Sequence, residues 1–348
     1  MKIAGKYLNA GMELSEEIPE LSLSENLILT DNIVAILKNN NIDYIDIKVS
    51  SEFDTFSPSI KNLIKSILKS DDVNELHDLA VFLTEIVSNA KELKFDTSTY
   101  LLQDYNHIVN TIIITSLLAK KYNEIAESTL QVDLESAIYA SILADIGRRA
   151  KNKETLHFLK ENYNGYLKEF RKLVPNLKLS LFSKYDSKYH PIYSYFFCKY
   201  YKTSENVKMA VLLHHEKESG ELSLLNTPLE SKEDEEYARI ARIIKLADLF
   251  DIIYRNNALN KTDNPFDGIG RKLDAIVASN FVNAKLTNIL KTIIPIYQVG
   301  MKVLLSDGTV GIISENDAND YNNPTVVDLN GDFINLREES LQVIKQAN

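Results

Sequence analysis

The chain has 348 residues, of which 45% are hydrophobic and 25% are charged, and these proportions exclude a protein that is disordered throughout. The length favours two or three domains over one continuous core. With 39 Lys and Arg residues against 49 Asp and Glu residues, the formal net charge is −10. Because no basic block offsets this charge, duplex nucleic acid is not expected as a partner.

Two further absences narrow the class of protein. No stretch approaches about 18 consecutive apolar residues, so no membrane span is expected. The chain does not open with a basic segment followed by an apolar one, and we therefore expect a cytoplasmic protein. The single cysteine, Cys198, cannot form an internal disulfide or build a thiolate metal site alone.

Residues 1–72 are predicted to form a small α+β domain. Apolar residues at helical spacing predict a helix over Asp31–Asn39, which a run of asparagines ends. Alternation of polar and apolar residues over Tyr44–Val49 predicts a half-buried strand. The polar run at Ser70–Asp72 indicates a linker or a helix cap.

Residues 73–290 carry a helical pattern almost throughout. Proline and glycine are sparse in this region, as a bundle of long helices requires. The pattern changes over residues 291–348, which are predicted to be rich in β-structure. A hairpin is expected around the Asp307-Gly308 turn, followed by a third strand over Pro324–Leu329 and a tight turn at Asn330-Gly331.

Several side chains of metal-ligand type project from otherwise apolar helical faces in the middle region. They are His107, Asp145, His190, His214, His215 and Asp248. An Asp on a buried helical face costs several kcal/mol unless it is paired, hydrogen-bonded or metal-bound. Imidazole and carboxylate groups together suit Fe, Mn, Zn or Co. A lone buried histidine is usually a satisfied core residue, and helical spacing alone does not prove that these groups meet.

The order of motifs resembles the HD-GYP branch of the HD metal-dependent phosphohydrolases. The resemblance spans residues 98–262, and it rests on His107, Leu143–Gly147, His190-Pro191, His214-His215-Glu216 and Ala247–Asp251. It implies a mainly α fold, an HD-type helical bundle, here with a small α+β domain before it and a small β-rich unit after it. Members hydrolyse the cyclic dinucleotide cyclic di-GMP to linear pGpG, and some continue to GMP, at a centre of two or three metal ions.

The resemblance also implies roles for individual residues. His107, Asp145, His190, His214, His215 and Asp248 would be ligands of a divalent metal ion such as Fe or Mn, with Asp145 bridging two ions. Arg148 stands where the family has a phosphate-binding lysine, and it keeps the charge with a different geometry. Arg255 is a nearby substitute for a basic substrate contact further along the chain.

The departures from the family pattern are equally informative. Ala144 replaces the signature histidine of the His-Asp pair, and Gln103 stands where some members have a ligating glutamate. No Gly-Tyr-Pro loop follows His215. We therefore expect reduced metal occupancy and weak or no phosphodiesterase activity.

Four interpretations remain open from the sequence. The chain is a phosphodiesterase that keeps slow activity, a non-catalytic module that binds a cyclic dinucleotide or a protein signalling partner, an otherwise active enzyme in which Ala144 has replaced a histidine, or an unrelated helical fold. His77 and His157 lie outside the motif order and are expected at the surface or at helix caps. Cys198 is expected to be a small core residue.

Overall fold

The computed structural model describes most of the chain, with gaps between the described segments. The described residues are 2–4, 8, 12–40, 44–48, 58–69, 72–90, 107–149, 189–220, 225, 228–259, 269–294, 302–315, 324–336, 341 and 343–346.

The N-terminal region forms a small three-stranded antiparallel sheet with one α-helix. Its elements are β1 (Lys2–Ala4), β2 (Glu13–Leu14), η2 (Pro19–Leu21), α1 (Asp31–Asn39) and β3 (Tyr44–Lys48), and the strand order is β1-β3-β2. The predicted helix and strand are both confirmed here. The Thr30 side chain accepts from the Ile33 N–H at the start of α1, which explains why the helix begins at this point.

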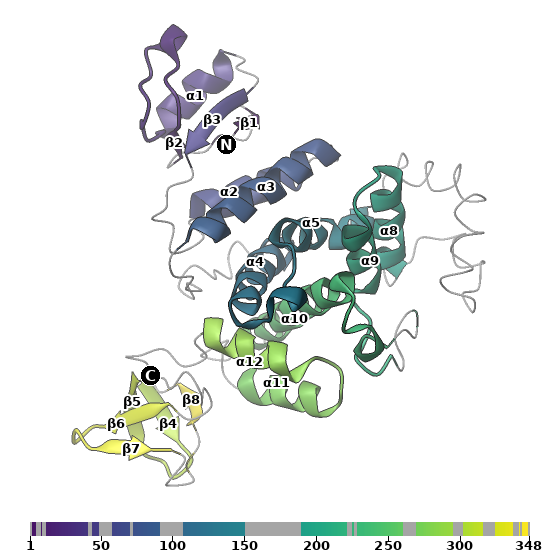
Figure 1. The fold of residues 1–348 in the computed structure, drawn as a ribbon. Helices are drawn as coiled ribbons and strands as arrows, with labels where there is room; N and C mark the ends of the chain where they lie inside the picture. Colours follow the sequence, from purple (N-terminus) through teal and green to yellow (C-terminus); the bar gives the residue numbers. More distant parts are fainter. Residues whose placement is uncertain are drawn as a thin grey trace.

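Helices make up the middle of the molecule (Figure 1). They are α2 (Pro58–Ile67), α3 (Val73–Asn89), α4 (His107–Ile125), η5 (Ser128–Leu130), α5 (Leu134–Ala144), η6 (Ile146–Arg149), α8 (His190–Tyr200), α9 (Glu205–Leu213), η9 (Glu230–Lys232), α10 (Glu236–Leu259), α11 (Ile269–Ala278) and α12 (Ala284–Ile293). Side chains cap several of their first turns. Asp72, Asp133 and Ser204 accept from backbone N–H groups at the starts of α3, α5 and α9. Asp72, the described residue of the polar run predicted at Ser70–Asp72, is thus a helix cap.

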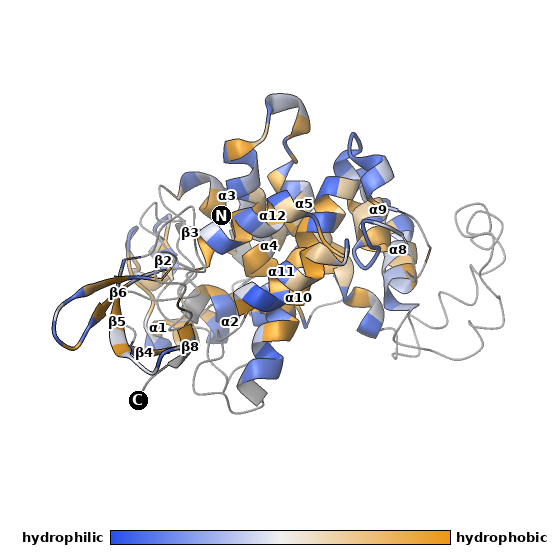
Figure 2. Cartoon of the chain, turned by 90° about the horizontal axis from the view of Figure 1, so that it is seen from below, coloured by the Kyte–Doolittle hydropathy of each residue, from blue (hydrophilic) through white to orange (hydrophobic). Residues whose placement is uncertain are grey.

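The core of this bundle lies where α4, α5, α9 and α10 meet. α10 packs against α4, α9 and α5, and α4 also packs against α5. Most of α4 and the second half of α5 are buried on every face, which matches their nearly uninterrupted apolar sequence. Figure 2 shows the corresponding concentration of hydrophobic residues along α4 and α5. A polar group on these helices is therefore enclosed by protein.

A five-stranded antiparallel sheet near the C-terminus has the order β7-β6-β5-β4-β8. Its strands are β4 (Lys302–Leu305), β5 (Val310–Glu315), β6 (Thr325–Asp328), β7 (Phe333–Asn335) and β8 (Val343–Gln346). The predicted turns lie at Gly308 and Gly331, whose φ angles of 91° and 93° favour glycine. The buried residues of this sheet form a cluster separate from the helical core.

The mainly α fold with a small C-terminal β unit is confirmed. The division of the chain at residues 72/73 and 290/291 stays a prediction. Among the described helices, none combines the length and the apolar character that a bilayer crossing requires.

Candidate metal centre

Five helices bring the predicted ligand residues together. His107 is the first residue of α4, and Asp145 follows the last residue of α5. His190 is the first residue of α8, and its neighbour Pro191 suits the first turn of a helix. His214 follows the last residue of α9, with His215 next to it. Asp248 lies in the middle of α10 and is buried. Four of the five helices thus place a predicted ligand residue at or next to one of their ends.

The three histidines of α8 and α9 form a tight group, here called the three-histidine cluster. His190 Nε2 lies 3.3 Å from His214 Nε2 and 3.1 Å from His215 Nε2. One ligand atom from each histidine lies within 4.8 Å of those of the other two. His190 and His214 are buried, and His215 is half-buried. This group could hold a metal ion.

The two separations from His190 Nε2 have the length expected between ligands of a single ion. Nitrogen ligands about 2.0–2.1 Å from one ion lie roughly 2.9–3.4 Å apart at octahedral to tetrahedral angles. The two Nε2 separations of 3.1 and 3.3 Å fall in that range. His214 Nδ1 donates to the Val211 carbonyl at 2.6 Å, so the proton of the neutral ring sits on Nδ1 and a lone pair remains on Nε2. The donor set therefore suits a divalent cation.

The Asp145 carboxylate lies between this cluster and His107. Its Oδ1 is 3.0 Å from His190 Nε2, and its Oδ2 is 3.7 Å from His107 Nε2. The Arg148 Nε also donates to Asp145 Oδ1, at 2.6 Å. Each carboxylate oxygen thus faces a different histidine, which is the arrangement that a bridging ligand needs.

His107 is the centre of a second group, here called the His107 cluster. Its Nε2 lies 2.8 Å from Asp248 Oδ1, and its Nδ1 lies 2.6 Å from Asp251 Oδ2. Asn110 donates to the other oxygen of Asp251 at 3.0 Å. Because ionised carboxylates only accept hydrogen bonds, both ring nitrogens of His107 act as donors in this arrangement. The ring is then a cation held between two carboxylates.

The pKa values of the histidines differ between the two clusters. Burial lowers the pKa of His214 to about 4, with the nearby His190 acting in the same direction, and burial holds the pKa of His215 well below its usual range. Burial would also lower the pKa of His107, but its hydrogen bonds to Asp248 and Asp251 raise it to about 10. Burial opposes ionisation of Asp145, yet the hydrogen bond from His190 keeps the pKa of this carboxyl well below its usual range. At neutral pH the cluster therefore offers neutral imidazoles at His214 and His215, beside a carboxylate.

Buried charges on α10 anchor the segment that follows the histidine pair. Lys245 Nζ donates to the Glu216 carbonyl at 2.6 Å, and Arg242 Nε donates to both oxygens of Glu218 at 3.0 Å. Glu216 in turn accepts from the Leu225 N–H at 2.9 Å. The segment that follows His215 is therefore attached to the same helix that carries Asp248.

The remaining residues singled out from the sequence have more varied positions. Ala144 is buried at the end of α5, beside Asp145. The Arg148 side chain is 45% exposed, and Arg255 is half-buried on α10, two helical turns beyond Asp248. Cys198 is fully buried, as expected of a core residue. Gln103 and His157 lie outside the described residues.

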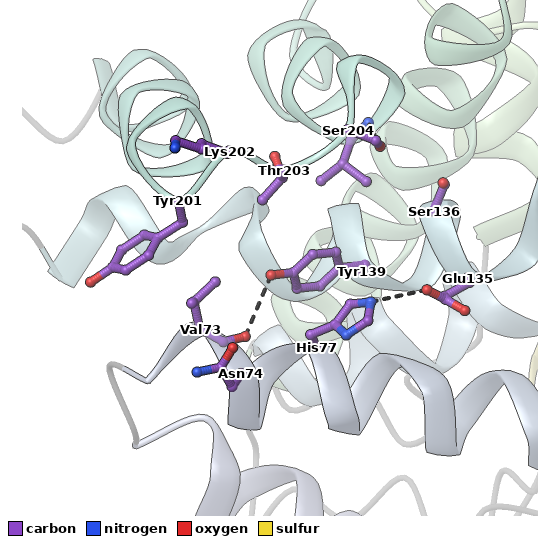
Figure 3. A pocket seen from close by; sticks show the side chains of 11 residues that line it. Val73, Asn74, His77, Glu135, Ser136, Tyr139, Tyr201, Lys202, Thr203 and Ser204 are labelled. Atoms are coloured by element: carbon purple, nitrogen blue, oxygen red, sulfur yellow. Dashed lines mark hydrogen bonds and ion pairs between the residues drawn. The ribbon is translucent and has the colours of Figure 1, made fainter.

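His77 lies at a separate pocket of about 350 Å³ near the N-terminal ends of α3, α5 and α9 (Figure 3). Its Nε2 is 3.0 Å from Glu135 Oε1, and its ring packs edge-on against Tyr139. The side chain is 47% exposed, so the expectation of a surface histidine is confirmed. This pocket shares no residue with the three-histidine cluster.

The sequence did not predict that Asp251 and Asn110 belong to the His107 cluster, although Asp251 is part of the Ala247–Asp251 motif. Asp251 and Asn110 had no role assigned from the sequence. A signal for Asp251 exists in α10, where five buried charged residues recur at every third position. They are Arg239, Arg242, Lys245, Asp248 and Asp251. Successive charges at this spacing are turned by about 60° around the helix axis, so they face several neighbouring elements, and each buried charge predicts a buried partner.

Comparisons of this chain with protein-family models, with curated proteins and with solved structures gave no match.

Proposed function

We propose that this chain is a metal-binding signalling protein built on an HD-GYP-like phosphodiesterase scaffold. His190, His214, His215 and Asp145 hold one divalent ion, such as Fe or Mn, and a cyclic dinucleotide is the ligand. The observation that carries this proposal is the convergence of three Nε2 atoms, two pairs of which lie 3.1 and 3.3 Å apart, beside an Asp145 oxygen at 3.0 Å. The cyclic dinucleotide follows from the motif resemblance.

The chain's own residues have distinct tasks in this proposal. Asp145 faces both clusters, as does Asp248, whose Oδ2 lies 4.0 Å from His215 Nδ1. Arg148 offers an exposed guanidinium beside Asp145. A chain with a net charge of −10 needs such a local positive group to attract a phosphodiester. Arg255 is a second basic group on α10. A divalent ion at the cluster would supply Lewis-acid stabilisation of negative charge on the phosphodiester.

Hydrolysis is weak or absent in this proposal. Ala144 offers no ligand, and His107 is already satisfied by Asp248 and Asp251. A second ion at the His107 cluster would have to displace a proton from a ring whose pKa is about 10. The pairing of His107 with Asp248 and Asp251 also favours the second candidate function, which is a non-catalytic module that binds a cyclic dinucleotide or a protein partner without turnover.

Metal content and turnover together test the proposal. The full chain is loaded with Mn²⁺ or with Fe²⁺ under anaerobic conditions, desalted, and assayed for metal by elemental analysis and for cyclic di-GMP hydrolysis by chromatography. We expect about one ion per chain, micromolar binding of cyclic di-GMP by calorimetry, and slow or no formation of pGpG. His214→Ala should lose the ion, whereas the matched His77→Ala, which removes an exposed histidine, should keep it. Wild-type protein that retains no ion contradicts the proposal.

A further inference from the structure

Ser194 joins α8 to the turn that carries Asp145. It is fully buried and lies four residues after His190, on the same face of α8. Its Oγ donates to the Ala144 carbonyl and accepts from the Gly147 N–H, both at 2.8 Å. These two backbone groups lie on either side of Asp145 in the chain. One hydroxyl therefore holds the turn around Asp145 from both directions.

The backbones of the two segments are in close contact at this point. A Cβ atom added to Gly147 would lie 2.3 Å from the His190 carbonyl oxygen and 2.8 Å from the Ser194 nitrogen. Only glycine permits such an approach, because any larger residue would push η6 away from α8. The contact includes the backbone of His190, the residue whose Nε2 meets Asp145 Oδ1 at 3.0 Å.

Other buried serines in the bundle have a different role. Ser116 donates to the Ile112 carbonyl and Ser141 to the Ile138 carbonyl, each within its own helix. Those bonds satisfy a hydroxyl without joining two elements. Ser194 instead donates to a carbonyl at the end of α5 and accepts from an N–H at the start of η6, so its hydroxyl links two elements to α8.

We infer that Ser194 is a positioning residue for the metal centre, because its bridge sets the Asp145 carboxylate against the His190 imidazole. The part of this inference that concerns metal affinity rests on the proposed function, whereas the part that concerns the position of Asp145 against His190 does not. A hydrogen-bonded group outside the ligand set typically changes metal affinity by about 10–100-fold. Ser194 acts through the backbone on both sides of Asp145, without touching a ligand atom.

The test uses the full chain and three variants. Ser194→Ala removes both hydrogen bonds, Ser194→Thr keeps the hydroxyl, and Ser116→Ala is the matched control because it removes an equally buried serine from α4. Ser194→Cys, which keeps the volume and only a weak donor, replaces the alanine variant if that variant does not fold. Imidazole ¹⁵N NMR of metal-free protein reports whether His190 Nε2 carries the proton that it donates to Asp145. Visible absorption during Co²⁺ titration reports affinity and ligand geometry.

We expect Ser194→Ala to lose the fixed Nε2–H form of His190 and to bind Co²⁺ roughly 10–100-fold more weakly with an altered spectrum. Ser194→Thr should restore most of both, and Ser116→Ala should stay within about threefold of wild type. The inference is overturned if Ser194→Ala behaves like Ser116→Ala, or if affinity falls while His190 is unchanged. If wild type binds no Co²⁺ but Ser194→Ala still frees His190, the proposed function fails and the positioning role stands.

Discussion

The two halves of the candidate centre contain similar residues in opposite states. In the three-histidine cluster, two of the imidazoles have pKa values held below the usual range by burial, and nitrogen atoms face one another at 3.1 and 3.3 Å. In the His107 cluster, one imidazole donates to two carboxylates, and its pKa is raised to about 10. Asp145 faces both.

The three-histidine cluster depends on a cation from outside the chain, whereas the His107 cluster does not. A single proton on His190 Nε2 cannot satisfy Asp145, His214 and His215 together, and the remaining buried lone pairs would be stabilised by a cation. The His107 cluster already contains its own positive charge between Asp248 and Asp251. One half therefore gains much from a metal ion, and the other half is complete without one.

The largest expected effect is the contrast between His214→Ala and His107→Ala. Structural Zn²⁺ binding is worth about 10–16 kcal/mol over four ligands, so loss of one ligand should weaken Zn²⁺ binding roughly 10²–10³-fold. His107→Ala should weaken it less than about tenfold, because His107 contributes no ligand to the three-histidine cluster. Competition with a chromophoric chelator measures both affinities. Equal losses would show that the two halves act as one site.

Asp251→Asn should affect stability more than metal binding. It removes the charge of the fully buried Asp251 and leaves the half-buried His107 with one charged partner in place of two, and breaking a buried ion pair costs roughly 3 kcal/mol of unfolding free energy. Urea denaturation of metal-free protein measures this loss. The matched control is Glu124→Gln, which removes the carboxylate of the Lys121–Glu124 pair, exposed on both sides, and should cost less than about 1 kcal/mol. A fall in Zn²⁺ affinity as large as that of His214→Ala would contradict the separation of the two clusters.

Lys245 should make the anchoring of the segment after His215 depend on pH. Burial lowers the pKa of Lys245 to about 8, below its ordinary value of 10.5, so the unfolded chain binds more protons between these two values. Stability contributed by this residue should therefore rise as the pH increases from about 8 to about 10. The difference in unfolding free energy between wild type and Lys245→Met should shift in favour of wild type by roughly 2 kcal/mol. Urea denaturation at a series of pH values measures it, and a difference that does not change with pH would contradict the lowered pKa of Lys245.

Ala144→His should give the smallest change in metal binding, and it tests whether residue 144 lies in the ligand sphere. The new imidazole would stand beside Asp145, between the two halves, and we expect metal content to rise above one ion per chain with partial recovery of cyclic di-GMP hydrolysis. Ala144 is buried, so added volume should cost about 1–3 kcal/mol of stability. Ala144→Phe adds comparable volume without a ligand and is the matched control. Elemental analysis with the hydrolysis assay measures the outcome, and no change in metal content would mean that residue 144 lies outside the ligand sphere.

Local features of this protein follow from its sequence because they depend on near neighbours. The helix over Asp31–Asn39, the cap at Asp72 and the hairpin turn at Gly308 are confirmed, and each rests on residues only a few positions apart. The polar groups on apolar helical faces were also identifiable, since helical periodicity places them there. The Asp307-Gly308 and Asn330-Gly331 turns needed no tertiary information.

Only the tertiary structure decided which of these groups meet and in what state. His107 and Asp251 are 144 residues apart and share a 2.6 Å hydrogen bond, and Ser194 bridges Ala144 and Gly147 across 50 and 47 residues. Such contacts depend on how helices cross, which periodicity within one helix does not specify. The charge of an imidazole follows from its neighbours in space and from burial. The sequence by itself therefore determined the donor types, and packing decided that two histidines stay neutral while a third becomes a cation.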